Sequence, residues 1–182
     1  MPDDAVPDTN ARMLSMRAGA QWRLQDLSQD EQQRANTFLH ETPLHAHLGI
    51  TLIEAGPEGV RARMPIAGNA LNTTGNLHGG AIATLIDVAA GTCAAVGSGF
   101  TPGEQTIVTA DMHLRYLGRP KGEFVDAVAT ILRAGRTLII VDCEVVDAEG
   151  HVVAVCDFSA MVVNFRQPLR PEAVTDPAAP DL

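Results

Sequence analysis

Short runs in which apolar and polar residues alternate dominate the chain after residue 48. In the run VRARMPI, Val60, Ala62 and Met64 alternate with two arginines, as in a half-exposed β-strand. The preceding run GITLIEAG and the link PEG complete a predicted hairpin. Four more such runs follow, namely QTIVTADMHLRYL, GEFVDAVATILRA, TLIIVDCEVVD and HVVAVCDFSAMVVNF. Short glycine-containing links join them, and we therefore predict an antiparallel four-strand meander.

A helical pattern separates the hairpin from the meander. From Gly79 to about Val96, apolar residues recur at spacings of one, three and four, which gives a stripe wide enough to lie across a sheet. The stripe consists of Ala81, Ile82, Leu85, Ile86, Ala89, Ala90, Cys93 and Ala94.

The second face of this helix carries small residues. It holds Asp87 among Ala83, Thr84, Gly91 and Ala94. A solvated face normally carries Lys, Glu and Gln, so we expect another backbone to pack here, most simply the same helix of a second copy. The chain is therefore expected to be at least a dimer.

The N-terminal part predicts one short helix. Ser28 followed by Glu31 is typical of a capping box, and Gln29 to His40 contains strong helix formers, with Pro43 expected to end the helix. Residues 1–20 are polar and without period, and residues 166–182 are rich in proline. We therefore expect a flexible extension at 1–20, one folded domain at 21–165 and a proline-rich tail at 166–182.

Composition narrows the classes of function. A chain of 182 residues that is 46% apolar can bury the core of a single domain. Its net charge of −9 argues against unaided binding to nucleic acid or to an anionic membrane. Three cysteines without a CxxC pair favour a reduced cytoplasm, and the acidic start does not have the pattern of a secretory signal.

The apolar segment from Gly79 to Phe100 could also suggest a membrane span. Asp87 lies at its middle, where a charge at the bilayer centre costs at least about 2.5 kcal/mol. We therefore expect no membrane span.

The start of the long helix could carry chemistry. Gly79 and Gly80 follow His78, and glycine lets a ligand approach N–H groups that have no partner within the helix. Such groups can bind a developing oxyanion or polarise a carbonyl oxygen, although plain turn chemistry is an alternative explanation for the glycines.

Asp87 is the other candidate, but it lies about 12 Å from Gly79 along the helix. One chain cannot join the two groups. Two antiparallel helices packed on their small faces could bring Asp87 of one copy to Gly79 of the other, which would give two identical sites. The alternative is that Asp87 is a partly solvated or capping residue at a dimer interface.

Other chemistries find little support. His45 and His47 alternate as on one face of a strand, with His40 nearby, but no carboxylate or cysteine completes a metal set, so we predict no metal. The sequence contains no GxSxG, GxGxxG or P-loop motif.

The stretch NTTGNLHGGAIATLID closely resembles the signature of hotdog-fold acyl-CoA thioesterases of the PaaI-like group. The matching residues are Asn72, Gly75, His78, Gly79, Gly80, Leu85 and Asp87. The resemblance extends from PLHAHLGITL through IVTADMHLRYLGR and RAGRTLIIVDCEV to about Phe165. It implies an α+β hotdog fold, in which an antiparallel sheet wraps around a long central helix. It also implies dimers that share a continuous sheet and often associate in pairs.

The resemblance also implies roles for individual residues. Asp87 would act as nucleophile or general base, and the Gly79 amide would polarise the thioester carbonyl. Asn72 would orient substrate or water, and His78 would support the loop. Thr109 would hold the attacking water from the opposite subunit. The substrate would be an acyl-CoA, with no cofactor beyond the coenzyme A that it contains.

Basic residues could bind the phosphates of coenzyme A. Arg133 and Arg136 form a small basic turn around Gly135, although a solvated hairpin turn is the alternative. A second basic group consists of Arg115, Arg119 and Lys121.

A non-hydrolytic hotdog protein remains the alternative function. It would be a dehydratase or hydratase acting on acyl thioesters, or an acyl-CoA-binding regulator.

Overall fold

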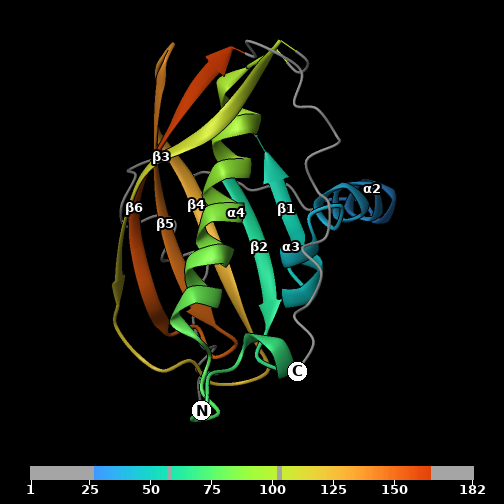
Figure 1. The fold of residues 1–182 in the computed structure, drawn as a ribbon, viewed down its shortest axis with the longest axis vertical. Helices are drawn as coiled ribbons and strands as arrows, with labels where there is room; N and C mark the ends of the chain where they lie inside the picture. The colour runs from blue at the N-terminus through green and yellow to red at the C-terminus, as the bar shows by residue number, and fades with distance from the viewer. Residues whose placement is uncertain (1–26, 57–58, 102–103, 165–182) are drawn as a thin grey trace, which may run out of the picture.

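The computed structural model describes residues 27–56, 59–101 and 104–164. Within these ranges the chain forms a six-stranded antiparallel sheet that curves around one long helix, α4 (Gly79–Ser98) (Figure 1). The strands are β1 (Thr51–Gly56), β2 (Gly59–Pro65), β3 (Gln105–Tyr116), β4 (Phe124–Ala134), β5 (Leu138–Asp147) and β6 (Val152–Asn164). The predicted α+β architecture is confirmed. The predicted extension at 1–20 and the tail at 166–182 lie outside the described residues.

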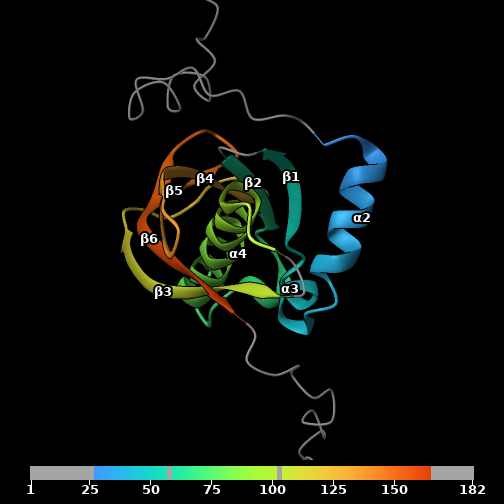
Figure 2. The ribbon, with the colours of Figure 1, turned by 90° about the horizontal axis from the view of Figure 1, so that it is seen from above.

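The helix α4 is central because its apolar stripe faces the sheet. Every residue of the predicted stripe is buried, and Val88 is buried as well. Seen from above, the strands curve around α4 (Figure 2). Ala94 was predicted to lie on both the apolar and the small face; its place on the small face is wrong, because Ala94 is fully buried. The sheet reaches this side of α4 too, since Thr109 of β3 hydrogen-bonds Asp87.

The hairpin of β1 and β2 is confirmed, but the predicted meander is wrong for β3. The order across the sheet is β1-β2-β4-β5-β6-β3, so β4, β5 and β6 form a meander while β3 pairs with β6 at the edge. Three strand spacings are roughly 14 Å, and the extended link 117–123 reaches about 23 Å. A short link can therefore cross two intervening strands, which the glycine pattern alone does not reveal.

The N-terminal segment forms two helices beside β1, α2 (Gln29–Leu39) and α3 (Pro43–Leu48). The capping box of Ser28 and Glu31 is confirmed. Asn36 ties α2 to the sheet, because its Oδ1 accepts a hydrogen bond of 2.7 Å from the Leu52 N–H. Pro43 follows the end of α2 as predicted, and it also begins α3.

His45 and His47 lie on α3, so their predicted place on a strand is wrong. A proline at the first helical position and a left-handed Gly49 at the end make the short run PLHAHL a helix.

Among the described residues, α4 alone is long and apolar enough to cross a membrane. Half of its apolar window is buried inside the protein, and the core helix of a folded domain meets the same criteria of length and composition. Here the sheet covers its apolar stripe.

Candidate active site

A side-chain network shapes the loop before α4. Oδ1 of Asn72 accepts hydrogen bonds from the Thr74 N–H, the Thr74 hydroxyl and the Asn76 N–H, at 2.9, 2.7 and 3.0 Å. Gly75 takes a positive φ of 74° within this turn. The side-chain oxygen of Asn72 therefore holds the loop, and the NH₂ group is the part of this side chain that is left for a ligand.

His78 caps the N-terminus of α4. Its Nδ1 accepts a hydrogen bond of 2.9 Å from the Gly80 N–H, so Nδ1 carries no proton. The Gly80 amide is thereby occupied. The Gly79 N–H, at the first position of the helix, donates to no described residue. Of the two predicted glycines, Gly79 is thus the one whose amide can bind a carbonyl oxygen.

A pocket of about 360 Å³ opens at this helix start. Gly79, Asn76, Tyr116 and Arg119 are among the residues that line it. The Tyr116 hydroxyl donates a hydrogen bond of 2.8 Å to the Gly79 carbonyl and so joins the end of β3 to α4. Asn76 directs its Nδ2 to Thr74, and its buried Oδ1 has no partner among the described residues. The pocket therefore combines the Gly79 amide with a cation, Arg119.

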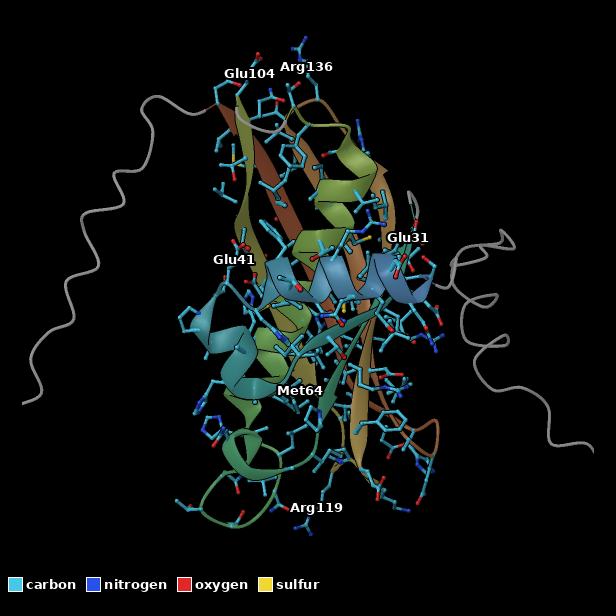
Figure 3. The ribbon with its side chains drawn as sticks, turned by 90° about the vertical axis from the view of Figure 1, so that its right-hand side faces the viewer. Glu31, Glu41, Met64, Glu104, Arg119 and Arg136 are labelled. Atoms are coloured by element: carbon cyan, nitrogen blue, oxygen red, sulfur yellow. The ribbon has the colours of Figure 1, made fainter. Side chains whose placement is uncertain are left out.

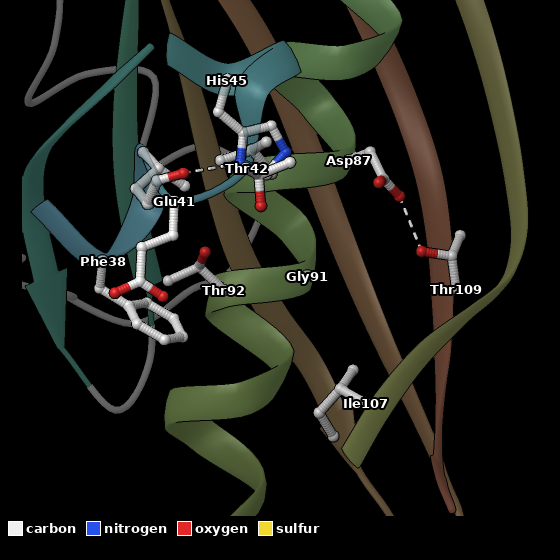
Figure 4. Close-up of a pocket in the computed structure, with 11 residues that line it drawn as sticks. Phe38, Glu41, Thr42, His45, Asp87, Gly91, Thr92, Ile107 and Thr109 are labelled. Carbon is white, nitrogen blue, oxygen red and sulfur yellow. Dashed lines mark hydrogen bonds between the residues drawn. The ribbon is translucent and has the colours of Figure 1, made fainter. Parts of the chain in front are cut away.

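Asp87 lies in a second pocket, of about 520 Å³. Thr109 projects from β3 toward it, and the Thr109 hydroxyl donates a hydrogen bond of 2.7 Å to Oδ1 of Asp87 (Figure 4). The bond lies within one chain, although Thr109 was expected to serve the site of an opposite subunit. Val88, Gly91 and Ile107 line the same pocket and give it an apolar wall.

The structure therefore sorts the predicted catalytic residues into two groups. Asp87 and Thr109 share one pocket, whereas Asn72, His78 and Gly79 lie at the helix start. The two groups are about 12 Å apart along α4, so no single thioester group can touch both within one chain.

The basic turn of Arg133 and Arg136 lies at the far end of the sheet from Gly79. Leu138 follows this turn and pairs with Met161 of β6, which in turn pairs with Val108 near the start of β3. Gly79, in contrast, contacts Tyr116 at the end of β3. Arg136 and Arg119 accordingly lie at opposite ends of the molecule in Figure 3. Among the described residues that line the pocket at the helix start, Arg119 is the basic one.

Cysteine and metal chemistry find no site here. The three cysteines are buried, and burial raises the pKa of the Cys93 thiol to about 12 and of the Cys156 thiol to about 11. Neither is a thiolate near neutral pH. In the described part of the chain, no three His, Cys, Asp or Glu side chains are grouped so that they could hold a metal ion.

Sequence reasoning missed several residues of both pockets. Tyr116 ends a strand and carries no local signal, since its contact to Gly79 depends on the position of β3. Phe38, Glu41 and His45 line the Asp87 pocket from α2, α3 and the turn between them, a placement that no local pattern predicts.

Comparisons with known proteins agree on the family. The family model described as thioesterase superfamily matches residues 74–154. A candidate esterase of Deinococcus radiodurans is 32% identical over 124 residues, which are 67% of this chain and 75% of that protein. Human acyl-coenzyme A thioesterase 13 is 32% identical over 107 residues, 58% of this chain and 74% of that protein.

Solved structures show the same fold. A thioesterase from Haemophilus influenzae superposes with a TM-score of 0.67 at 20% identity and covers 79% of this chain and 96% of its own. A mutant thioesterase from Pseudomonas aeruginosa gives a TM-score of 0.68 at 20% identity, with 77% and 99% covered. The chain thus has the hotdog fold and belongs to the thioesterase superfamily, a membership that supports thioester hydrolysis as its general activity.

Proposed function

We propose that the protein hydrolyses acyl-CoA thioesters to a free acid and coenzyme A, at sites shared between two copies of the chain. The observation that carries this proposal is the hydrogen bond between Thr109 and Asp87, which aims a carboxylate with no other hydrogen bond to a described residue into a pocket. The similarity to acyl-coenzyme A thioesterase 13 and the PaaI-like motif support coenzyme A as the leaving group. The chain is proposed to act in the cytoplasm.

In the proposed reaction the carbonyl oxygen of the thioester accepts a hydrogen bond from the Gly79 amide. That amide stabilises the negative charge that develops as the carbonyl carbon becomes tetrahedral. Asp87 either removes a proton from an attacking water or attacks the carbonyl carbon itself. In both routes the C–S bond breaks, the thiolate of coenzyme A leaves, and water supplies the oxygen of the acid.

Thr109 suits the water-mediated route. Its only hydroxyl proton is donated to Asp87, so the Thr109 oxygen can accept a hydrogen bond from a water molecule. A water held by Thr109 and Asp87 would point an oxygen lone pair into the pocket. The NH₂ group of Asn72 donates to no described residue and is proposed to orient the substrate.

The dimer is proposed because one chain holds each half of the site separately. The edge strand β3 is twelve residues long, and its outer edge is unpaired among the described residues. Such an edge tends to pair with another strand, and pairing two copies of β3 would continue the sheet. Antiparallel α4 helices would then bring Asp87 of one copy to Gly79 of the other. A further pairing of dimers is part of the same proposal.

The phosphates of coenzyme A need cationic partners. Arg119 is the proposed partner, because it lines the same pocket as Gly79. Arg133 and Arg136 stay the alternative partners of the phosphates. Gly80 is proposed to let the substrate come close to the helix start.

Loss of the carboxylate tests the chemistry. Asp87→Ala is expected to abolish thiol release from acyl-CoA while the affinity for acyl-CoA, measured by calorimetry, stays within a few fold. If the protein were an acyl-CoA-binding regulator, both the parent and Asp87→Ala would bind acyl-CoA, and neither would release thiol. Unchanged turnover in Asp87→Ala would refute the assignment of Asp87.

Mixing two inactive variants tests the shared site. Gly79→Pro removes the amide proton, and the extended backbone of His78 accepts a following proline at the first helical position. Gly79→Ala is the matched control, because it keeps the N–H but, like proline, adds a Cβ atom, which would lie 3.2 Å from the Tyr116 hydroxyl. Random mixing of Asp87→Ala with Gly79→Pro should restore about a quarter of the parent activity, since half of the dimers would be mixed and each would hold one intact site of two. A site within one chain predicts no recovery.

A further inference from the structure

The two pockets differ in charge. The pocket at Gly79 includes Arg119, whereas the pocket at Asp87 is lined by no described lysine or arginine and holds a second carboxylate, Glu41. Two carboxylates disfavour the phosphates of coenzyme A through like-charge repulsion. The Asp87 pocket is therefore the place for the acyl group.

The N-terminal helices supply one wall of this pocket. Phe38 of α2 lines it with 75% of its surface exposed, and Ile107 lines it from β3 (Figure 4). Val88 of α4 lines it as well. A Cβ atom at Gly91 would meet nothing within 4 Å, so the floor beside Asp87 is open. Aliphatic or aromatic carbon of an acyl group would cover Phe38 and remove its apolar surface from water.

Two side chains of the same wall, Glu41 and His45, offer hydrogen-bond acceptors, and the Thr42 hydroxyl beside them can donate or accept. The Glu41 carboxylate makes no hydrogen bond or ion pair with a described residue. Nδ1 of His45 lies 3.2 Å from the Leu39 carbonyl, which can only accept, so Nδ1 carries the proton. In the neutral ring, Nε2 is then an acceptor and is the nitrogen left for a ligand.

We propose that the α2–α3 segment selects the acyl group. Glu41 and His45 favour an acyl group whose far end donates a hydrogen bond, such as a hydroxyl, over one that ends in a carboxylate. A donor would satisfy the acceptors of the wall, whereas a carboxylate would face Glu41 with the same charge. This inference rests on the proposed function, because it names the substrate class of the same site.

The test compares three acyl-CoAs with chains of equal length, ending in a hydroxyl, a methyl or a carboxylate. The parent protein should give the highest kcat/KM for the hydroxyl and the lowest for the carboxylate. Glu41→Gln should raise kcat/KM for the carboxylate-ended substrate at least about fivefold, the effect of one charge about 4 Å away in water. The methyl-ended substrate should change less than about twofold, because its end carries no charge.

Glu104→Gln is the matched control. It removes the same charge just before the start of β3, far from Glu41 in Figure 3. The relative kcat/KM values of the three substrates should therefore stay unchanged. If Glu41→Gln changes all three substrates equally, or if the parent prefers the carboxylate, the inference is overturned while thiol release still supports the proposed function. If the parent releases no thiol from any of the three, the proposed function fails and the inference with it.

Discussion

The Thr109 hydroxyl and Oδ1 of Asp87 are 2.7 Å apart and join the edge strand β3 to the central helix α4. Oδ2 of Asp87 has no hydrogen bond to a described residue. One carboxylate oxygen is thus fixed by the sheet and the other is left for a reactant. Because both residues belong to one chain, this half of the site is oriented before any substrate binds.

Removing the hydroxyl of Thr109 should slow the reaction. Thr109→Val keeps the shape of the side chain but leaves Asp87 free to rotate, and we expect kcat to fall about ten- to hundredfold, the range seen for small misplacements of reacting groups. Thr109→Ser keeps the hydroxyl and should stay within a few fold of the parent. Steady-state thiol release measures both. Equal activity of the valine and serine variants would show that the hydrogen bond does not orient Asp87.

His78 is predicted to act through the helix start. His78→Ala removes the side chain that accepts the Gly80 N–H and should lower the free energy of unfolding by about 1 kcal/mol, as loss of a helix cap does. His78→Asn restores a capping acceptor and should recover the stability measured by urea denaturation. If the asparagine variant recovers stability but not kcat, His78 also contacts the substrate.

The sequence predicted the elements that depend on local pattern. The apolar spacing from Ala81 to Cys93 located α4 and its buried face, and the alternation in β2 located a hairpin. The glycines after His78 marked a helix start, and the structure leaves the Gly79 amide without a described partner. Each of these features depends on residues within one or two turns of one another.

Features that depend on the path of the chain could not be predicted in this way. The edge position of β3 depends on the link 117–123 crossing two strands, and the wall of the Asp87 pocket depends on where the chain places α2 and α3. The catalytic role of Asp87 could be predicted only from the resemblance of its motif to a known family. By itself, an aspartate at this position could equally be a structural residue at a dimer interface.

The ion pair between β2 and β4 should contribute to the stability of the scaffold. Arg63 binds Asp126 through two hydrogen bonds of 2.7 and 2.8 Å and lies 3.5 Å above the Phe124 ring, while Asp126 is only 4% exposed. The hydrogen bond to Asp126 raises the pKa of Arg63. Asp126→Ala should lower the free energy of unfolding by about 2 kcal/mol, less than for a fully buried pair because Arg63 is partly exposed.

A double-mutant cycle isolates this pair. If Arg63→Ala and Asp126→Ala were additive in urea denaturation, the two side chains would not stabilise each other. Arg63→Lys should recover only part of the loss, since lysine cannot form both hydrogen bonds or stack on Phe124 in the same way.

Asp147 should make the stability of the fold depend on acid pH. This residue, 4% exposed at the end of β5, accepts N–H bonds from His151, Lys121 and Glu149, and so holds the link that crosses the sheet. Burial by itself raises the pKa of Asp147, but these hydrogen bonds outweigh it and hold the pKa below its ordinary value. A carboxyl whose pKa is lowered by folding stabilises the protein above its unfolded pKa, near 4, and loses that contribution as the pH falls through the folded value.

Asp147→Asn should therefore lower the free energy of unfolding by about 1–3 kcal/mol at pH 7, because an amide cannot accept all of these hydrogen bonds and one of its ends would face the Lys121 N–H. Below about pH 4 the parent carboxyl gains a proton on unfolding, so the gap between parent and variant should shrink. Urea denaturation between pH 7 and pH 3 measures the gap, with the exposed Glu104→Gln as control. A gap that stays constant to pH 3 would mean that the charge of Asp147 does not hold the crossing link, and that its shape alone does.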